Sequence, residues 1–496
     1  MHTRFLTAFL IAFLATLGTA SSQTAENALA DAVRQGDTET ISSLLAGGGD
    51  PNQVEADGAT ALHWAVYQDN LEAATLLVHA GADVAVANRD GATALYLACV
   101  NGNAGIIELL LDNGADANAV VTEQGETALM LASLTGSADA VKALLGRGAE
   151  VNQSQERGQT ALMWAASEGH ADVLGVLISN GADVGARSIE STREERRPPG
   201  GMTALMFASR DGGIDSAKAL VAAGANLNQT MADGTSPLVM AIVNGHYELG
   251  LYLLNQGANP NIADSHNRAA LYAAIDMRNV QWAQGSAPTG DSLDPLLLIK
   301  ALVGAGAEPN AALVGKVNNR GAFDMRWSDT IGATPFVRAA QNGDIEVLQL
   351  LLAYGANPFV ETSVEETAMH LLGGVGWPLG QGHIRTDDEI LASYDLLISL
   401  GLDVNAANAS GITPLMGAAY KGENVAVQYL VDHGADMYAT DDEGRNALAW
   451  AEGVLATLAQ PRRRQPHTEV LLLELMGSPV DANVDGNIDA AANVGP

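Results

Sequence analysis

Apolar and polar positions along this chain follow a unit that recurs about every 33 residues. One copy, at positions 158–185, reads GQTALMWAASEGHADVLGVLISNGADVG. It holds a short apolar run after Thr, then a Gly, a second apolar run and the triplet Gly-Ala-Asp. The residues that open successive copies are Thr60, Thr93, Thr127, Thr160, Thr203, Ser236, Ala269, Thr334, Thr367, Thr413 and Asn446. Repetition at this period predicts a stack of small units, where the length of 496 residues alone would suggest about three ordinary domains.

Each copy predicts two short helices joined by a turn. The opening Thr suits an N-cap, and Pro237, Pro335 and Pro414 follow at the first helical position, where proline's missing N–H costs nothing. The second apolar run keeps helical spacing, as in Val173 and Leu177, and ends at a Gly suited to a left-handed backbone. A single pair of such helices cannot bury its apolar face, so neighbouring pairs must stack to form a continuous core.

A period of 33 residues with Thr-Ala/Pro-Leu followed by Ala-Ala resembles the ankyrin repeat, over residues 26–476. The resemblance implies an all-α repeat fold, an ankyrin solenoid of about 11–12 helix–turn–helix repeats with β-turn fingers and insertions toward the C-terminus. It also implies a binding scaffold, because ankyrin stacks mostly bind other proteins and have no chemistry of their own.

The chain divides into three predicted segments. Residues 1–20 read as a signal peptide, since Arg4 precedes the apolar run Phe5–Leu17 and a small-residue cleavage site ends at Ala20. An uncleaved anchor is the alternative, but thirteen apolar residues are too few to span a bilayer. The solenoid follows at 21–476, and 477–496 form a disordered acidic tail. Inserts are expected near 189–199, 277–293, 312–328, 373–388 and 453–468.

Charge and cysteine content narrow the partners and the compartment. The formal net charge of −33 disfavours nucleic acid and anionic membranes, and it would steer a basic protein partner toward the chain. The single cysteine, Cys99, suits a buried small side chain and cannot form an internal disulfide. With the signal peptide, this favours a bacterial protein that is secreted or periplasmic. We expect a monomer with no membrane contact after cleavage.

The sequence predicts no enzyme chemistry, cofactor or metal site. It contains no H-E-x-x-H, no G-x-S-x-G, no phosphate loop and no paired-cysteine motif. The run Asp481–Asp489 resembles the start of a calcium loop, but Ala492 stands where the bidentate acid belongs. Among the histidines, only His383 lies in an irregular segment, so a catalytic role there has no visible partner residues.

Two sets of residues are candidates for partner binding. In ankyrin proteins the finger turns and the ends of the first helices line a concave groove, and these positions vary here between copies. The groove candidates are Tyr67, Gln68, Arg89, Asp90, Val100, Asn101, Leu134, Thr135, Glu156, Arg157, Ser167, Glu168, Arg210, Asp211, Val243, Asn244, Gln341, Asn342, Tyr420 and Lys421. The second set, from the inserts, is Trp282, Trp327, Trp377 and His383. Either the insert residues form a second binding surface, or they pack on each other and cover the stack.

The favoured function is a protein–protein interaction scaffold that binds an exported partner through the groove, without catalysis. One alternative is an accessory partner that stabilises one particular periplasmic enzyme. A third hypothesis is an enzyme that uses the insert-rich C-terminal half, which a ligand bound near Trp377 and His383 would support. By contrast, Trp64, Trp164 and Trp450 share one repeat position, which predicts that they pack inside the stack.

Overall fold

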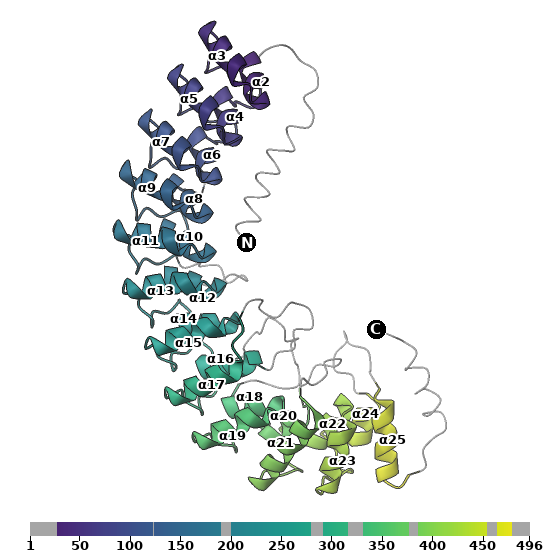
Figure 1. Cartoon of the computed structure of the whole chain (residues 1–496). Coiled ribbons are helices and arrows are strands. Elements are labelled where there is room, and N and C mark those ends of the chain that lie inside the picture. The colour runs from purple at the N-terminus through teal and green to yellow at the C-terminus, as the bar shows by residue number, and fades with distance from the viewer. Residues whose placement is uncertain are drawn as a thin grey trace. The chain divides into compact units, whose positions relative to one another are not determined.

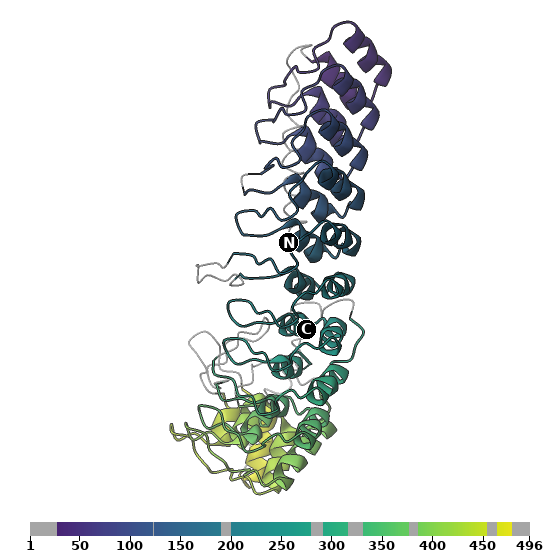
Figure 2. The ribbon, with the colours of Figure 1, turned by 90° about the vertical axis from the view of Figure 1, so that its left-hand side faces the viewer.

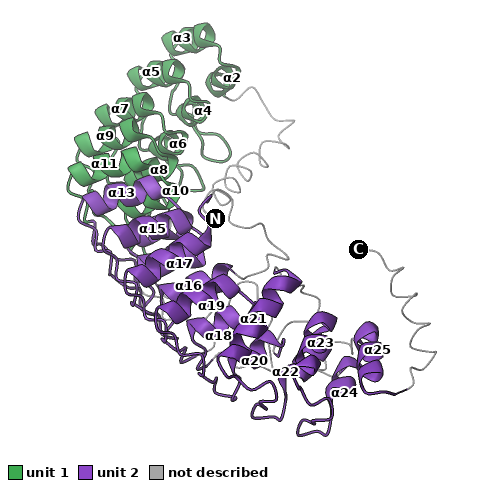
Figure 3. Ribbon diagram, turned by 60° about the horizontal axis from the view of Figure 1, so that its bottom comes forward, with its two compact units in different colours: residues 1–183 green, residues 184–496 purple. Residues whose placement is uncertain are grey.

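The computed structural model describes residues 27–122, 124–189, 200–278, 291–315, 331–375, 385–453 and 464–478. These form two compact units, residues 1–183 and 184–496, and each unit is described by itself (Figure 3). The predicted signal peptide, the central part of each predicted insert and nearly all of the tail lie outside the described residues, so those assignments stay predictions.

Unit 1 is a double layer of paired helices. Its helices are α2 (Ala28–Gln35), α3 (Thr38–Ala46), α4 (Ala61–Tyr67), α5 (Leu71–His79), α6 (Ala94–Asn101), α7 (Ala104–Asp112), α8 (Ala128–Thr135), α9 (Ala138–Gly146), α10 (Ala161–Glu168) and α11 (Ala171–Ser179). The first helix of each pair contacts the first helix of the next pair, and the second helices contact one another in the same order (Figure 1).

Unit 2 continues the same arrangement. Its helices are α12 (Ala204–Asp211), α13 (Ile214–Ala222), α14 (Pro237–Val243), α15 (Tyr247–Asn255), α16 (Ala270–Arg278), α17 (Pro295–Gly304), α18 (Pro335–Gln341), α19 (Ile345–Ala353), α20 (Ala368–Leu372), α21 (Asp387–Ser399), α22 (Pro414–Lys421), α23 (Asn424–Asp432), α24 (Ala447–Ala451) and α25 (Pro466–Leu475). Across the described residues the two units hold twelve pairs, which confirms the predicted all-α repeat fold.

Local chemistry explains where these helices begin and end. At α6 the Thr93 hydroxyl accepts from the N–H of Tyr96 at 3.2 Å, and Gly102 ends the helix with a φ of 70°. Such a backbone strains any residue that carries a Cβ, which is why glycine recurs at this position. The finger turns leave the second helices and project from one side of the helix layers (Figure 2).

The repeated Thr-Ala/Pro-Leu motif supplies the core. Its leucines lie between neighbouring helix pairs and are almost completely buried, at Leu62, Leu95, Leu129, Leu162, Leu205, Leu238, Leu271 and Leu415. Small alanines beside them let the first helices approach closely, as at Ala65 and Ala98, which have no exposed surface. The core is therefore a continuous strip within each unit.

A ladder of asparagine side chains joins consecutive repeats. The Asn118 side chain donates to the carbonyl of Gly148 at 2.9 Å and accepts from the N–H of Glu150 at 2.7 Å. The same pair of bonds is made by Asn52, Asn152, Asn261, Asn310 and Asn405. Asn228 holds the same position and accepts from the N–H of Asn259 at 2.8 Å, and in other repeats the position holds Ala85, Gly185, Phe359 or Tyr438. The ladder thus fixes the spacing of the repeats wherever the amide is present.

The shared tryptophan position is structural, as predicted. Trp64, Trp164 and Trp450 are buried, and each indole N–H donates to a side chain of the preceding finger. The Trp64 bond to Glu55 is 2.6 Å long, and the Arg34 guanidinium lies 4.9 Å from the Trp64 ring centroid. These contacts tie each finger to the helix that follows it.

Candidate partner-binding surface

The finger tips of unit 1 present four of the exposed candidate side chains. Backbone bonds align successive tips, because the N–H of Arg89 donates to the carbonyl of Asp57 at 2.9 Å and that of Glu156 to Gln124 at 3.0 Å. The side chains of Arg89, Asp90, Glu156 and Arg157 are exposed. Within the described part of the chain none of these four side chains has a hydrogen bond or ion pair. They are fixed at the backbone and available at their charged ends, and together they are called the finger-tip surface.

At the ends of the first helices in unit 1, three candidate side chains bind backbone carbonyls of the preceding repeat, which the sequence does not predict. The Gln68 amide donates to the carbonyl of Arg34 at 2.9 Å, and the Asn101 amide donates to the carbonyl of Val66 at 2.8 Å. The Thr135 hydroxyl lies 3.4 Å from the carbonyl of Cys99 in the same relation. Each reaches the last turn of the preceding first helix, so these variable positions satisfy carbonyls that a helix end leaves free.

The remaining candidates at these helix ends are partly exposed. They are Tyr67, Val100, Ser167, Glu168, Arg210, Val243, Asn244 and Gln341, while Asp211 is exposed. In unit 2, Arg210 pairs with Asp211 at 2.6 Å and its guanidinium lies over the Phe207 ring, 5.0 Å from the centroid. The Asn244 amide donates to the carbonyl of Met240 at 2.8 Å. Much of their polar capacity is therefore used within the chain.

For three candidates the expected surface position is corrected. Leu134, Asn342 and Tyr420 are buried, because the end of each first helix turns these side chains toward neighbouring helices. Tyr420 packs edge-on against Trp450, with ring centroids 5.8 Å apart. A partner cannot reach these three side chains without opening the stack.

Lys421 is also withdrawn from the surface. Its side chain is 5% exposed, and its amine lies 2.7 Å from the carboxylate of Glu423. Burial lowers the pKa of this amine to about 8, although the nearby Glu423 charge opposes the shift. The insert candidates Trp282, Trp327, Trp377 and His383 lie outside the described residues, and their role stays a prediction.

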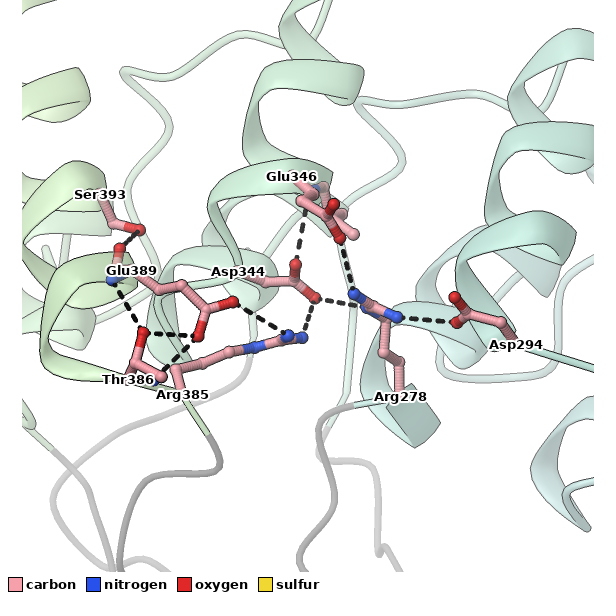
Figure 4. Close-up of polar contacts among 9 residues, drawn as sticks. Arg278, Asp294, Asp344, Glu346, Arg385, Thr386, Glu389 and Ser393 are labelled. Carbon is pink, nitrogen blue, oxygen red and sulfur yellow. Dashed lines mark hydrogen bonds and ion pairs between the residues drawn. The ribbon is translucent and has the colours of Figure 1, made fainter.

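Unit 2 contains an ion-pair network around the buried Asp344, which no motif in the sequence indicates (Figure 4). Asp344, at the N-cap of α19, is 1% exposed and accepts from Arg278 at 2.8 Å and from Arg385 at 2.6 Å. Arg278 also contacts Asp294 at 3.0 Å and Glu346 at 3.2 Å. Four helices, α16, α17, α19 and α21, begin or end at this network, and carboxylates at helix N-termini are favoured by the helix dipole.

A second buried pair supports the network from the first-helix layer. The Arg338 guanidinium on α18 lies 2.6 Å from Asp276 on α16, and Asp276 is almost completely buried. Tyr272 packs beside them in a small apolar cluster with Leu313 and Val337. Burial raises the pKa of the Tyr272 hydroxyl, so it stays protonated near neutral pH. Because these charges are buried in pairs, we infer that they hold neighbouring repeats of unit 2 together.

The histidines and the cysteine of the described residues have structural surroundings. No group of three or more His, Cys, Asp or Glu among them could hold a metal ion. Cys99 is buried and unpaired, as the sequence predicts, and burial raises the pKa of its thiol. His170 and His246 use Nε2 to contact the carbonyls of Leu134 and Arg210, which is a structural use. No helix in the described ranges is long and apolar enough to span a membrane.

Comparison with known proteins decides the family. A family model described as "Ankyrin repeats (3 copies)" matches residues 29–121, 116–188, 188–264, 205–284 and 390–458, and one described as "Ankyrin repeat" matches residues 331–363. The chain belongs to the ankyrin-repeat family. Ankyrin repeats are protein-interaction modules, and this ankyrin-repeat chain is accordingly built as a protein-interaction scaffold on a fold that is typically non-catalytic.

Individual relatives match this ankyrin-repeat chain only in part. A palmitoyltransferase AKR1 from Lachancea kluyveri is 34% identical over 122 residues, which is 24% of this chain and 15% of the relative. The B-cell lymphoma 3 protein homolog of Mus musculus is 30% identical over 202 residues, which is 39% of this chain and 40% of the relative. The chain thus spans less than half the length of either relative. A crystal structure of the human ASB11 ankyrin repeat domain is 26% identical, with a TM-score of 0.41, and covers 47% of this chain and 99% of that one.

Proposed function

We propose that this chain is an exported scaffold that binds a protein partner through the finger-tip surface and the exposed parts of the neighbouring first-helix ends, without catalysis. The observation that carries the proposal is the contrast at Arg89, Asp90, Glu156 and Arg157. Their backbone is held by bonds between fingers, while their charged ends have no partner in the described part of the chain. Because the backbone of these residues is already ordered, binding has to order only their side chains, which lowers the entropy lost when a partner pairs with them.

The chemistry of the finger-tip surface favours a protein over a polyanion. Arg89 lies next to Asp90, and Glu156 next to Arg157, so both signs of charge alternate on a chain whose net charge is −33. Alternating charges select a partner by complementary pairing and penalise partners of the wrong pattern. The excess negative charge steers a basic protein toward the chain over distances of about 8 Å at physiological salt.

Export is proposed from the segment before the first described helix. The basic Arg4, the apolar run Phe5–Leu17 and the small residues ending at Ala20 form the pattern that a secretory peptidase recognises. Comparing the amount of the protein in the exported and the cytoplasmic fractions of its own cells, with amino-terminal sequencing of each, tests this. A chain in the exported fraction that starts at Ser21 supports the proposal, whereas a chain that keeps Arg4 and stays in the cytoplasmic fraction contradicts it.

A matched pair of variants tests the binding surface. Residues 21–496 would be used to capture partners from the exported fraction, and the dominant partner identified by mass spectrometry and then titrated. Asp90→Ala with Arg157→Ala should weaken its binding at least tenfold, because both changes fall on the finger-tip surface. Glu108→Ala with Lys142→Ala removes the same charges from exposed positions on the second helices, and should leave binding unchanged. Equal effects of the two pairs, or no partner at low and moderate salt, would overturn the proposal.

The identity and stability of the captured protein also distinguish a general scaffold from an accessory partner that stabilises one particular enzyme. An enzyme that loses thermal stability when this chain is removed would make the chain an accessory partner of that enzyme. A partner whose stability does not change would leave the chain as a general scaffold.

A further inference from the structure

Two exposed aromatic side chains of unit 2 stand where the ladder has asparagine in most other repeats. The N–H of Phe359 donates to Asn357 Oδ1 at 3.1 Å, and that of Tyr438 donates to Asp436 Oδ1 at 2.8 Å. The ladder residue Asn118 makes the same local bond. Phe359 and Tyr438 therefore share the ladder backbone but lack the amide that bridges to the next repeat.

The repeat after Phe359 has the residues whose backbone groups a ladder amide binds in other repeats. Gly401 and Asp403 occupy the positions in the next repeat that Gly148 and Glu150 occupy opposite Asn118. A phenyl ring cannot donate to the Gly401 carbonyl or accept from the Asp403 N–H. The ring is 59% exposed, so it does not gain buried packing in exchange. Folding alone gives no reason for this residue.

The two aromatic positions lie two repeats apart on the same edge of unit 2. Phe359 follows α19 and Tyr438 follows α23, and α21 lies between these helices in the second-helix layer (Figure 1). Since helix layers are about 10 Å apart, the two positions are separated by about 20 Å. An extended peptide covers that distance with about six residues. Tyr438 is 64% exposed, and a further exposed ring, Tyr354, caps α19.

The stretch of sequence that contains these rings is strongly acidic. Between positions 339 and 461 the chain has 17 acidic residues and three basic ones. Each of the three, Arg385, Lys421 and Arg445, is paired with a carboxylate of the same region. Asp403 and Asp436, in the loops of this edge, are exposed. Aromatic faces within a field of carboxylates favour arginine and lysine, whose apolar stems and cationic ends can meet both.

We propose that Phe359 and Tyr438 form a second binding surface for a basic, extended segment of another protein. This aromatic edge is separate from the finger-tip surface, and its proposal does not depend on what binds there. The exposed rings supply contact area, and the neighbouring carboxylates supply selectivity for positive charge. At Phe359 the two hydrogen bonds of a ladder asparagine are absent because the position presents an aromatic ring to a partner.

The test is direct binding of a defined peptide. A fluorescein-labelled 12-residue peptide of alternating arginine and serine would be titrated with residues 21–496, beside a glutamate–serine peptide of the same length. The double variant Phe359→Asn with Tyr438→Asn should bind the arginine peptide at least fivefold more weakly. The substitutions leave the net charge unchanged, so unchanged affinity would show general charge attraction only and would overturn the proposal. Preference for the glutamate peptide would overturn it too.

Two controls keep loss of binding separate from loss of folding. Phe359→Asn places the ladder amide opposite Gly401 and Asp403, so the urea midpoint of unfolding should rise while peptide binding falls. A lower midpoint would mean that the ring stabilises the fold, which would overturn the proposal. Val54→Asn makes the same kind of change at an exposed apolar residue of unit 1, and should leave peptide binding unchanged. The finger-tip variants should also bind this peptide normally, so the two surfaces can fail independently.

Discussion

Arg278 and Arg385 donate to the same carboxylate oxygen, Oδ2 of Asp344, at 2.8 and 2.6 Å. Arg278 ends α16 and Arg385 precedes α21, so they belong to repeats on opposite sides of the repeat that contains Asp344. One buried carboxylate thus joins three consecutive repeats of unit 2. Stacked repeats normally contact only their immediate neighbours, and this bridge adds a link across that limit.

Removing the Asp344 charge should destabilise unit 2 strongly. Asp344→Asn keeps the shape but leaves two largely buried guanidinium groups without their shared anion. Breaking a buried ion pair from one side costs about 3–5 kcal/mol when the remaining charge has no other partner. Arg278 keeps Asp294 and Glu346, and Arg385 keeps Glu389, so we expect a loss near the lower end of that range. Urea unfolding followed by circular dichroism measures the change in the free energy of unfolding.

The matched control is Asp294→Asn, which removes a carboxylate that also contacts Arg278. The Asp294 side chain is 55% exposed, so water replaces the lost contact and the change should stay below about 1 kcal/mol. Similar losses for both variants would show that the position of the charge does not matter, against the bridging role of Asp344.

The asparagine ladder makes predictions of opposite sign at two positions of unit 1. Asn118→Ala should lower the free energy of unfolding by about 1 kcal/mol, since it removes two exposed hydrogen bonds between repeats. Ala85→Asn should raise it by a similar amount, about 1 kcal/mol, because the new amide can reach the corresponding groups of Gly114 and Asp116. Both variants would be compared with the wild type by chemical denaturation. A loss of stability in Ala85→Asn would contradict the ladder.

The sequence predicts the repeat fold well because each repeat is specified locally. Thr93 caps its own helix and Gly102 ends it. The buried position of Leu95 is filled by an equivalent leucine in the regular copies. Capping, turn chemistry and apolar spacing all act within one period, and eleven opening residues report the same unit. Because these local signals agree, the sequence predicts the repeat fold before any contact between repeats is known.

The candidate site is less predictable because its chemistry depends on contacts between repeats. Nothing local shows that the Gln68 and Asn101 amides bind carbonyls of the preceding repeat, or that Asn342 is buried. Variation between copies predicts partner binding, yet part of it reflects different ways to satisfy the same helix ends. The Asp344 bridge joins residues that are far apart in sequence and carry no shared motif, so spacing could not reveal it.

Buried His370 should make the protein sensitive to mild acid. Burial lowers the pKa of His370 to about 4, below the ordinary value of 6.5, and its Nδ1 accepts from the N–H of Thr367 at 3.1 Å. The unfolded chain therefore binds a proton between pH 6.5 and 4 that the folded chain does not, and stability falls as pH decreases through that range. The full loss is about 3 kcal/mol for this group at 1.36 kcal/mol per pKa unit.

Denaturation between pH 7 and pH 5 avoids most carboxylates, which titrate at lower pH. Burial also lowers the pKa of His63, so a variant is needed to separate the contribution of His370. His370→Gln keeps a side chain that can accept from the N-cap N–H and does not titrate. The variant should lose about 1–2 kcal/mol less stability than the wild type over this range. Equal pH slopes for the two proteins would show that the neutral, buried state of His370 does not contribute.

Lys421 should produce the opposite dependence at alkaline pH. Burial lowers the pKa of its amine to about 8 from 10.5, so the folded chain releases a proton that the unfolded chain keeps between those values. The contribution of Lys421 to stability should therefore rise with pH from about 8 to 10, by up to about 3 kcal/mol. Buried acids oppose this gain, since burial raises the pKa of the Cys99 thiol and raises that of Tyr247 to about 12, and the unfolded chain loses these protons before the folded chain does. Lys421→Met cannot titrate at this position, so the wild type should gain stability relative to the variant from pH 8 to 10, whatever the loss of the Glu423 contact does to the variant's absolute stability. A stability difference between the two proteins that stays constant over this interval would rule out the buried amine.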